Sequence, residues 1–324
     1  MFPTSSDARI VVSIVNYGTS ETVIAGLPAL QAELEGFRDS VILIVDNASP
    51  GEDGARLAAH VERERLGPRV RVILSPRNGG FAAGNNVAFA ACRELDWTPD
   101  AVLLLNPDAE VRPGAVREML AVMAAHPRAG VVGGRLENPD GSTWVAAFRF
   151  PSAMSEFALA TGVGALIRRW PRLVSDSETP KRVDWVSGAA MLVRWQALEG
   201  VGGMDEAYFL YYEEIDFMRR MNGAGWETWH APAALVLHDA GGATGMLDGR
   251  PRAGRMPDYW FESWRRYFAL NHGAGYARLA AWLKLAGMGA GFAQRRLRGR
   301  SYDLAPGFWE DFLRKAALAR MPGS

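Results

Sequence analysis

The chain has 324 residues, of which 48% are hydrophobic and 22% are charged, a composition typical of a globular protein and not of a disordered one. Lysine plus arginine and aspartate plus glutamate both number 36, so the formal net charge is zero and the basic excess of a dedicated nucleic-acid binder is missing. The single cysteine, Cys92, excludes an intrachain disulfide framework and a multi-cysteine metal site, and it fits a cytoplasmic location. We expect no signal peptide and no membrane span, because the first residues lack a cationic segment followed by an apolar run and no stretch approaches 18 uninterrupted apolar residues.

The first third of the chain alternates apolar segments with amphipathic ones. Strands are expected over 9–17, 40–47, 69–75 and 101–106, and helices over 21–35, 55–66 and 84–95. Each expected strand is apolar throughout, which is typical of a parallel sheet that is covered on both faces. The pattern therefore predicts a doubly wound α/β domain.

The pattern continues less regularly after Pro113, which suits the first turn of a helix. We expect a helix over 113–127, a short strand over 129–138, an irregular loop or lid over 151–181 and strand character over 182–195. A helix over 212–226 and a final strand that begins at residue 233 and ends at His238 are expected to follow.

Polar residues follow the expected strands. They are Asn16 and Tyr17, Asp46 and Asn47, Asn78 with two glycines, Asn106 and Asp108, and His238. Any one of them is explained as a turn residue or a helix cap. Ligands of open α/β sheets bind beyond the carboxyl ends of the strands, so the whole set predicts a ligand site at one edge of the sheet.

The glycines exclude two familiar nucleotide sites. The first strand leads into "NYGTSET", which has no G-x-G-x-x-G fingerprint, and no P-loop motif occurs anywhere in the chain. The glycine-rich "RNGGFAAGNN" follows the third strand instead, where it would allow the backbone to approach a sugar or a base closely.

Seven segments resemble the successive blocks of glycosyltransferase family 2, in the right order and spacing, and most of all its bacterial rhamnosyltransferases. They are "SIVNY", "VDNAS", "RNGGFAAGNN", "LLNPDAEVRPGA", "DWVSGAAMLVR", "GGMDEAYFLYYEEIDFMRR" and "HDAGG". The resemblance runs from about residue 9 to residue 245. It implies a GT-A fold, with a catalytic domain over 1–245 that binds nucleotide-sugar and acceptor, and it leaves a helical C-terminal extension over 246–324.

The resemblance also implies a metal site after the fourth strand. Family members place a D-x-D triplet there, and this chain has Asn106-Pro107-Asp108. Asp108 is then the expected ligand of Mg²⁺ or Mn²⁺ on the donor diphosphate, with His238 joining it, and a site with one carboxylate is compatible with Mg²⁺. Without the family context, a lone histidine after a strand is more often an ordinary surface or core residue.

For the nucleotide, the resemblance implies that Asp46 accepts a hydrogen bond from the base and that Tyr17 stacks on it. Asn78, Gly84 and Asn85 are expected to line the nucleotide pocket.

The catalytic base is expected in "YYEEIDFMRR". Family members carry Glu-Asp here, with the aspartate as the base that takes the acceptor proton. Glu214 occupies that position, and because its side chain is one methylene longer, either the pocket is wider or the base is Glu213. Asp216 is expected to cap the helix or to pair with Arg219 or Arg220. The alternative is a solvated acidic helix start.

The acceptor side is expected in "DWVSGAAMLVR". Asp184 is a candidate for contacts to acceptor hydroxyls, and Gly188 would leave room for the acceptor. Trp185 either stacks on a sugar ring or packs in the core.

The tail over 259–300 mixes aromatic residues with many arginines and has one acid, Glu262. Such a surface favours an anionic bilayer, although packing against the catalytic domain or against a second copy of the chain is the equal alternative. A polyprenyl-diphosphate-linked acceptor at the cytoplasmic face of the inner membrane would make a membrane contact useful.

The sequence therefore predicts an inverting, metal-dependent glycosyltransferase that uses a dTDP- or UDP-sugar, with dTDP-rhamnose favoured. The acceptor would be a hydroxyl of a surface glycan such as O-antigen, or of a lipid-linked oligosaccharide. One alternative, a sugar-phosphate nucleotidyltransferase, should show an early glycine-rich loop with a basic residue, which "NYGTSET" lacks. The other is a degenerate glycan- or nucleotide-sugar-binding module, which the departures at Asn106 and Glu214 keep open.

Overall fold

The computed structural model describes residues 2–3, 7–174, 177–238, 246–247, 250–251, 254–302 and 304–322. Of the block "HDAGG" only His238 falls within these ranges, so the other four residues of that block lie outside the described residues. Residue 245, where the catalytic domain was expected to end, also lies outside them.

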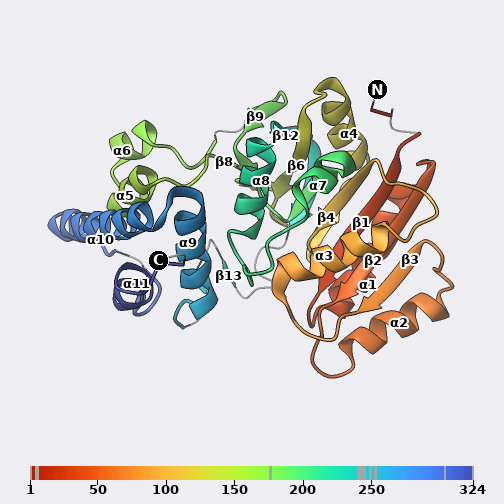
Figure 1. Cartoon of the computed structure of the whole chain (residues 1–324), viewed down its shortest axis with the longest axis horizontal. Coiled ribbons are helices and arrows are strands. Elements are labelled where there is room, and N and C mark those ends of the chain that lie inside the picture. Colours follow the sequence, from red (N-terminus) through yellow and green to blue (C-terminus); the bar gives the residue numbers. More distant parts are fainter. Residues whose placement is uncertain are drawn as a thin grey trace.

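One half of the main sheet is parallel, as expected. Its strands are β1 (Arg9–Asn16), β2 (Asp39–Asp46), β3 (Val70–Leu74) and β4 (Ala101–Leu105), in the order β3-β2-β1-β4 (Figure 1). The connecting helices are α1 (Ser20–Leu34), α2 (Asp53–Arg63) and α3 (Gly80–Cys92). Ile10 and Val12 belong to one core and Val11 to the other, so both faces of β1 are covered. This burial explains why the strands read as continuous apolar runs.

The other half of the sheet is mixed. β11 (Ala190–Arg194) lies antiparallel between β4 and β6 (Ala129–Glu137), β12 (Glu227–His238) runs parallel to β6, and β5 (Ala109–Val111) pairs antiparallel with β12. The helices that accompany these strands are α4 (Ala115–Ala125), α7 (Trp195–Val201) and α8 (Glu213–Gly223). The expected strand over 182–195 divides into β9 (Lys181–Val183), β10 (Trp185–Val186) and β11.

β12 begins six residues earlier than the sequence predicts. Its pairing with β6 shifts register between Ala231 and Leu235, around Pro232. Proline has no N–H to donate to a neighbouring strand and is tolerated within strands at such irregularities. Pro232 therefore made the first half of β12 unrecognisable as a strand from the sequence. Short strands complete the fold: β7 (Thr143–Trp144) pairs with β6, β8 (Ala147–Phe148) with β10, and β13 (Met246–Leu247) with β14 (Arg250–Pro251).

The expectation of an irregular segment over 151–181 is wrong for its first half. This part forms α5 (Ala153–Thr161) and α6 (Gly164–Arg169). Ser152 caps α5 in a reciprocal pair with Ser155. These helices are short, and their glycines and serines are typical of loops. Their helical conformation is therefore stabilised by packing against the rest of the protein.

The C-terminal extension is helical, as predicted. It contains α9 (Asp258–His272), α10 (Ala274–Leu297), α11 (Phe308–Phe312) and a π-helical turn (Leu313–Ala317). α10 packs closely on α5, because a Cβ on Gly287 would lie 2.6 Å from the Phe157 carbonyl oxygen and one on Gly291 would lie 2.6 Å from that of Ala160. Figure 1 shows these helices gathered at the end of the molecule opposite α2 and β3.

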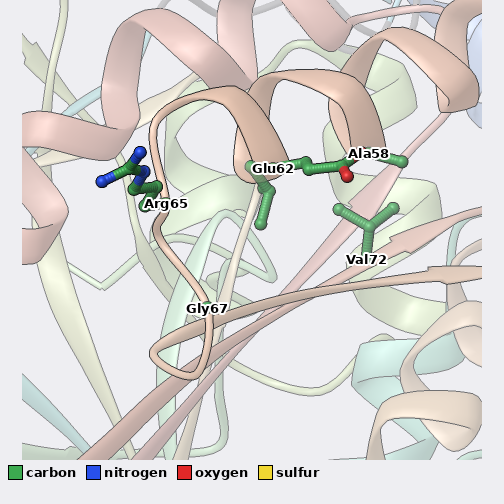
Figure 2. A pocket seen from close by; sticks show the side chains of 6 residues that line it. Ala58, Glu62, Arg65, Gly67 and Val72 are labelled. Carbon is green, nitrogen blue, oxygen red and sulfur yellow. The ribbon is translucent and has the colours of Figure 1, made fainter.

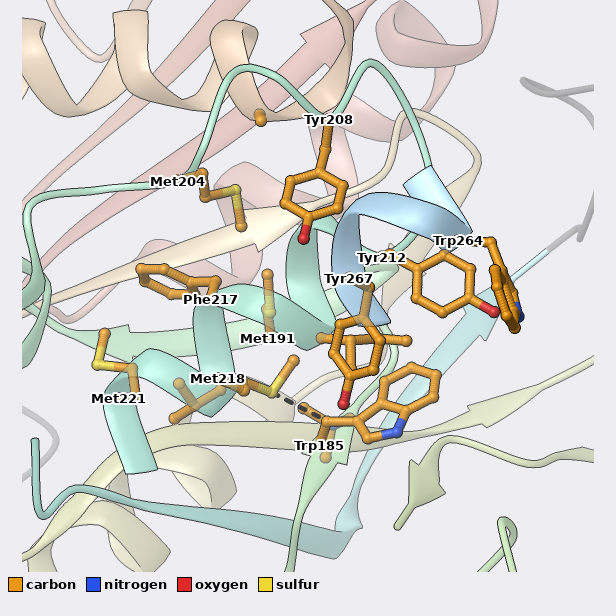
Figure 3. Packing of buried hydrophobic residues seen from close by; sticks show 14 of the residues in the cluster. Trp185, Met191, Met204, Tyr208, Tyr212, Phe217, Met218, Met221, Trp264 and Tyr267 are labelled. Atoms are coloured by element: carbon orange, nitrogen blue, oxygen red, sulfur yellow. Dashed lines mark hydrogen bonds between the residues drawn. The ribbon is translucent and has the colours of Figure 1, made fainter. Parts of the chain in front are cut away.

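The extension shares its core with the sheet. Trp264 of α9 and Phe217 of α8 are fully buried in one continuous cluster that also includes Met191 of β11. Figure 3 shows Tyr212, Tyr267 and Trp264 meeting where α8 and α9 approach each other. Packing on protein, one of the two roles considered for the tail, is therefore observed for its buried side. In the described part of the chain, no helix is long and apolar enough to cross a bilayer.

Candidate active site

Asp46 is held rigidly at the carboxyl end of β2. Its Oδ1 accepts hydrogen bonds from Asn16 Nδ2 (2.8 Å) and Ser49 Oγ (2.6 Å), and its side chain is almost fully buried. The Asn16 amide also donates to Asp53 (2.7 Å), which ties the ends of β1 and β2 to the start of α2. Tyr17 follows on the same edge and is 48% exposed.

The glycine-rich segment closes this edge at the start of α3. Asn78 Oδ1 accepts from Asn47 Nδ2 (2.9 Å) and from the Gly80 N–H (3.0 Å). Gly80 has φ +81°, and a Cβ there would lie 1.7 Å from the carbonyl oxygen of Phe209. Only glycine allows α3 to approach the loop before α8 this closely.

Gly84 and Asn85 lie on the inner side of α3. A Cβ on Gly84 would come within 2.6 Å of Val15, and Asn85 is fully buried with its Oδ1 accepting from Ser13 Oγ (2.8 Å). Both positions serve the packing of α3 on β1. The nucleotide contact expected of them stays a prediction.

Asp108 and His238 come together from different elements. Asp108 follows β4 and His238 ends β12, where it pairs with Ala109 of β5. His238 Nε2 lies 3.3 Å from Asp108 Oδ1, and their side chains are only 11% and 6% exposed. Nothing in the described part of the chain hydrogen-bonds to the buried Nδ1 of His238.

This pair fits a divalent cation that takes its remaining ligands from a diphosphate. One carboxylate oxygen and one imidazole nitrogen, both largely shielded from water, are donors that Mg²⁺ or Mn²⁺ accepts. A site made wholly of protein ligands is not present in the described ranges, which hold no group of three metal-ligating side chains.

The two glutamates lie at the start of α8, directly after a strained turn. Tyr211 and Tyr212 both have positive φ, 68° and 71°, which is unusual for bulky residues and is found at functional sites. Glu213 is 4% exposed, and the Oε2 atoms of Glu213 and Glu214 are buried without a hydrogen-bond partner among the described residues. The expected alternative, a solvated acidic helix start, does not match this burial.

Burial sets the protonation of this pair. It raises the pKa of Glu214 to about 7. Burial, and after it the charge of Glu214, raises the pKa of Glu213 well above its usual range. A carboxylate whose pKa lies near neutrality is matched to the work of a general base.

Glu214 lies next to Gly188, in the segment expected to meet the acceptor. A Cβ on Gly188 would lie 3.8 Å from both Cβ and Cγ of Glu214 and 3.7 Å from the Phe81 ring, so Gly188 brings the backbone close to the Glu214 side chain. The next residue, Ala189, accepts the Asn106 N–H through its carbonyl oxygen (2.9 Å). This connection links Glu214 to the turn that carries Asp108.

Asp184 and Trp185 are engaged within the protein. Asp184 accepts from Arg149 Nη1 (3.0 Å) and from the Phe150 N–H (2.9 Å). Trp185 is 8% exposed, stacks on Phe148 with ring centroids 4.0 Å apart, and donates from Nε1 to the Arg149 carbonyl oxygen (3.1 Å). Core packing, the second role considered for Trp185, accounts for this position.

Helix α9 braces the loop before α8, a contact that no sequence motif indicates. Ser263 Oγ donates to the Leu210 carbonyl oxygen (3.0 Å), and Arg266 donates to Asp205 (2.6 and 2.9 Å).

α9 also contacts Asp216 of α8, since Asn271 Nδ2 donates to Asp216 Oδ1 (3.2 Å). Asp216 also accepts from Arg220 Nε (2.9 Å), which is one of the two partners expected for it.

A buried charge cluster was also missed. Glu156 of α5 accepts from Arg172 and Lys284, at 2.5 Å each, and from Trp264 Nε1 (3.2 Å). Burial alone would raise the pKa of Glu156, but the two cations outweigh it and hold the pKa below its usual value. The same carboxylate adds to burial in raising the pKa of Tyr212, so the cluster lies close to the strained turn.

A surface hollow of about 390 Å³ lies elsewhere, between α2 and β3 (Figure 2). It is lined by Ala58, Val61, Glu62, Arg65, Gly67 and Val72, none of which belongs to the carboxyl edge. Its lining has one acid, Glu62, and one base, Arg65, and includes none of the expected site residues.

Comparison with known proteins identifies the family to which the chain belongs. The profile of glycosyl transferase family 2 matches residues 11–166. An N-acetylglucosaminyl-diphospho-decaprenol L-rhamnosyltransferase from Mycobacterium tuberculosis is 34% identical over 221 residues, which are 63% of this chain and 68% of that protein. The rhamnosyltransferase WbbL from Escherichia coli K12 is 29% identical over 164 residues, which are 50% of this chain and 61% of that protein.

Solved structures share the fold at low sequence identity. The mannosyltransferase PcManGT from Pyrobaculum calidifontis, in complex with GDP-Man and Mn²⁺, superposes with a TM-score of 0.53 at 12% identity and covers 96% of this chain and 80% of that one. The S. aureus protein TarS 1–349, in complex with UDP-GlcNAc, gives a TM-score of 0.54 at 14% identity and covers 95% and 81%.

The fold and its relatives define a glycosyltransferase of the GT-A type. The chain belongs to glycosyltransferase family 2, and the predicted likeness to the rhamnosyltransferase branch is confirmed.

Proposed function

We propose that the protein is an inverting rhamnosyltransferase that transfers rhamnose from dTDP-rhamnose to a hydroxyl of a polyprenyl-diphosphate-linked glycan. The observation that carries the proposal is the buried Glu213–Glu214 pair. Its Glu214 lies next to Gly188, and the following residue, Ala189, is hydrogen-bonded to Asn106 in the turn that carries Asp108. The names of the relatives from Mycobacterium tuberculosis and Escherichia coli support the choice of sugar.

In this proposal Glu214 takes the proton of the acceptor hydroxyl as its oxygen attacks the anomeric carbon. The bond from that carbon to the diphosphate oxygen breaks, and the dTDP leaves from the opposite face, which inverts the configuration. Glu213 stays protonated next to Glu214, because burial and the neighbouring charge raise its pKa. A single negative charge at the base position then suffices for the reaction.

Asp108 and His238 would hold the Mg²⁺ or Mn²⁺ ion, which when bound offsets the charge that develops on the leaving diphosphate. Asp46 would accept a hydrogen bond from the base, and Tyr17 would stack on it, since its ring is half exposed. Asn78, Gly84 and Asn85 would shape the pocket from α3. Asp184 and Gly188 would meet the acceptor.

The proposed place of action is the cytoplasmic face of the inner membrane, where lipid-linked intermediates of surface polysaccharides such as O-antigen are extended. The rival activity of a sugar-phosphate nucleotidyltransferase is not supported by the matched family. The second alternative, a degenerate module that binds glycan or nucleotide-sugar without catalysis, is distinguished from an enzyme by measuring turnover.

The test is a transfer assay with purified full-length chain, a lipid-linked N-acetylglucosamine diphosphate acceptor, and dTDP-rhamnose or UDP-sugars as donors. Release of dTDP that requires the acceptor, together with a product whose mass rises by one deoxyhexose, supports the proposal. Transfer from a UDP-sugar alone would overturn the donor, and nucleotide binding without turnover of any donor would favour the binding module.

A further inference from the structure

One face of α10 is apolar and exposed from Leu279 to Leu297. Its 24 residues include no aspartate or glutamate. Six exposed apolar side chains follow one another at intervals of three or four residues, so they lie on one side of the helix, whereas Phe292, which is also exposed, lies outside this series. They are Leu279, Trp282, Ala286, Ala290, Ala293 and Leu297, called here the α10 outer face. Trp282 is 46% exposed and Leu297 is 89% exposed, whereas the opposite side of α10 is buried on α5.

Arginines frame this face. Arg278 precedes Leu279, Arg296 precedes Leu297, and Arg300 lies three residues beyond the end of α10. All three are exposed, and they form no ion pair with any residue that the structure describes. An apolar stripe with an exposed tryptophan and unpaired arginines at its margins is typical of a helix that lies in a membrane interface.

The position of α10 suits such a contact. It lies at the end of the molecule away from α2 and β3 (Figure 1). Only Gly273 separates it from α9, the helix that braces the loop before Glu213 and Glu214. The start of α10 therefore adjoins the helix that holds the loop before these glutamates, and it lies away from the far edge of the sheet.

We propose that the α10 outer face docks on an anionic lipid bilayer, with the apolar side chains in the headgroup boundary and the arginines against lipid phosphates. The charge pattern favours a bilayer over a second copy of the chain. A symmetric dimer through this face would bring the arginines of two copies together, and α10 offers no acid to pair with them. The inference rests on the proposed function only in that a lipid-linked acceptor gives the docking a use.

The test is flotation of the full-length chain with vesicles of equal parts phosphatidylcholine and phosphatidylglycerol, and with phosphatidylcholine alone. The protein is expected to float with the anionic vesicles and to be released by salt. The double variant Leu279→Ser, Trp282→Ser should lower the partition coefficient by about tenfold or more. Arg278→Gln and Arg296→Gln should each lower it by about fivefold.

The matched control is Leu74→Ser, which removes a 61% exposed leucine on β3 and should leave flotation unchanged. Binding of dTDP, followed by calorimetry on the same variants, checks the fold and the donor site independently of the membrane. Equal flotation with both kinds of vesicle, no flotation, or an equal loss in the control would overturn the docking while leaving the proposed transfer intact. A dimer that is lost in the Leu279→Ser, Trp282→Ser variant would assign the face to a second copy instead.

Discussion

Replacing Glu214 with glutamine tests the assignment of the catalytic base most sharply. Glutamine keeps the size of the side chain but cannot accept a proton at neutral pH. A positioned general base contributes about 10²- to 10⁴-fold to a rate, so kcat should fall by about that factor. Binding of the nucleotide should be unchanged, because Glu214 faces Gly188 and not the ends of β1 and β2.

The pH dependence follows from the raised pKa. The pKa of Glu214 is about 7, so about half of the enzyme carries the ionised base at pH 7 and about a tenth at pH 6. Activity of the wild type should therefore rise with pH through about 7 and then level off. Glu214→Gln should lose this dependence along with the rate.

Stability should change in the opposite direction. Because the folded protein binds the Glu214 proton more tightly than the unfolded chain does, between about pH 4.5 and pH 7 the wild type loses stability as the pH rises. The accumulated loss above pH 7 is about 3 kcal/mol. Glu214→Gln avoids this loss and should be more stable than the wild type at pH 8 in urea denaturation.

Glu199→Gln is the matched control, since Glu199 is an exposed glutamate of α7 that pairs with Arg93. It should alter neither rate nor pH profile. The reasoning is refuted if Glu214→Gln keeps the wild-type rate, or if wild-type activity stays flat from pH 8 down to pH 5. Loss of rate in Glu213→Gln with full activity in Glu214→Gln would move the base to Glu213.

Two further predictions concern the elements that hold the site. Gly80 and Gly51 both have positive φ, so replacing either with alanine should lower the free energy of unfolding by about 1–2 kcal/mol through backbone strain. Gly80→Ala should lower it clearly further than Gly51→Ala, because only at Gly80 would the new Cβ overlap another backbone atom. Equal midpoints of the two variants in urea denaturation would contradict this. Glu156→Gln should destabilise by about 3–5 kcal/mol, because it leaves Arg172 and Lys284 buried beside a neutral group. Since the pKa of Glu156 is lowered, this contribution is present at neutral pH and disappears in the wild type as the pH falls into the acid range, which urea titrations at several pH values would reveal.

The parallel half of the sheet could be predicted because its strands are buried on both faces and read as unbroken apolar runs. The helices α1 and α2 follow with bounds within three residues of the expected ones. The convergence of polar residues on one edge then follows from the topology alone. The pairing of Asp108 with His238, more than a hundred residues apart, is the clearest example.

Features that depend on distant packing could not be predicted. α5 has few helix signals of its own, and its close partner α10 lies more than a hundred residues further along the chain. The same holds for Glu156, whose cation Lys284 belongs to α10. Trp185 looked equally suited to a sugar or to the core, and only the position of Phe148 distinguishes the two.

The local strain before α8 was also invisible in the sequence. Nothing in "FLYYEE" indicates that two consecutive tyrosines adopt positive φ. The brace from α9 explains how the conformation is held, since Ser263 and Asn271 fix the residues on either side of the turn. Such strain is maintained only when the surrounding structure determines it.

The most direct test of the account is calorimetric titration of dTDP and UDP into the wild type and Asp108→Ala, with Mg²⁺ or Mn²⁺ and again with a chelator. Asp140→Ala, at an exposed turn, is the control. The account predicts binding that needs the metal, prefers dTDP, persists in Asp140→Ala and disappears in Asp108→Ala. Binding of neither nucleotide by folded protein, or binding that depends on neither the metal nor Asp108, would contradict it.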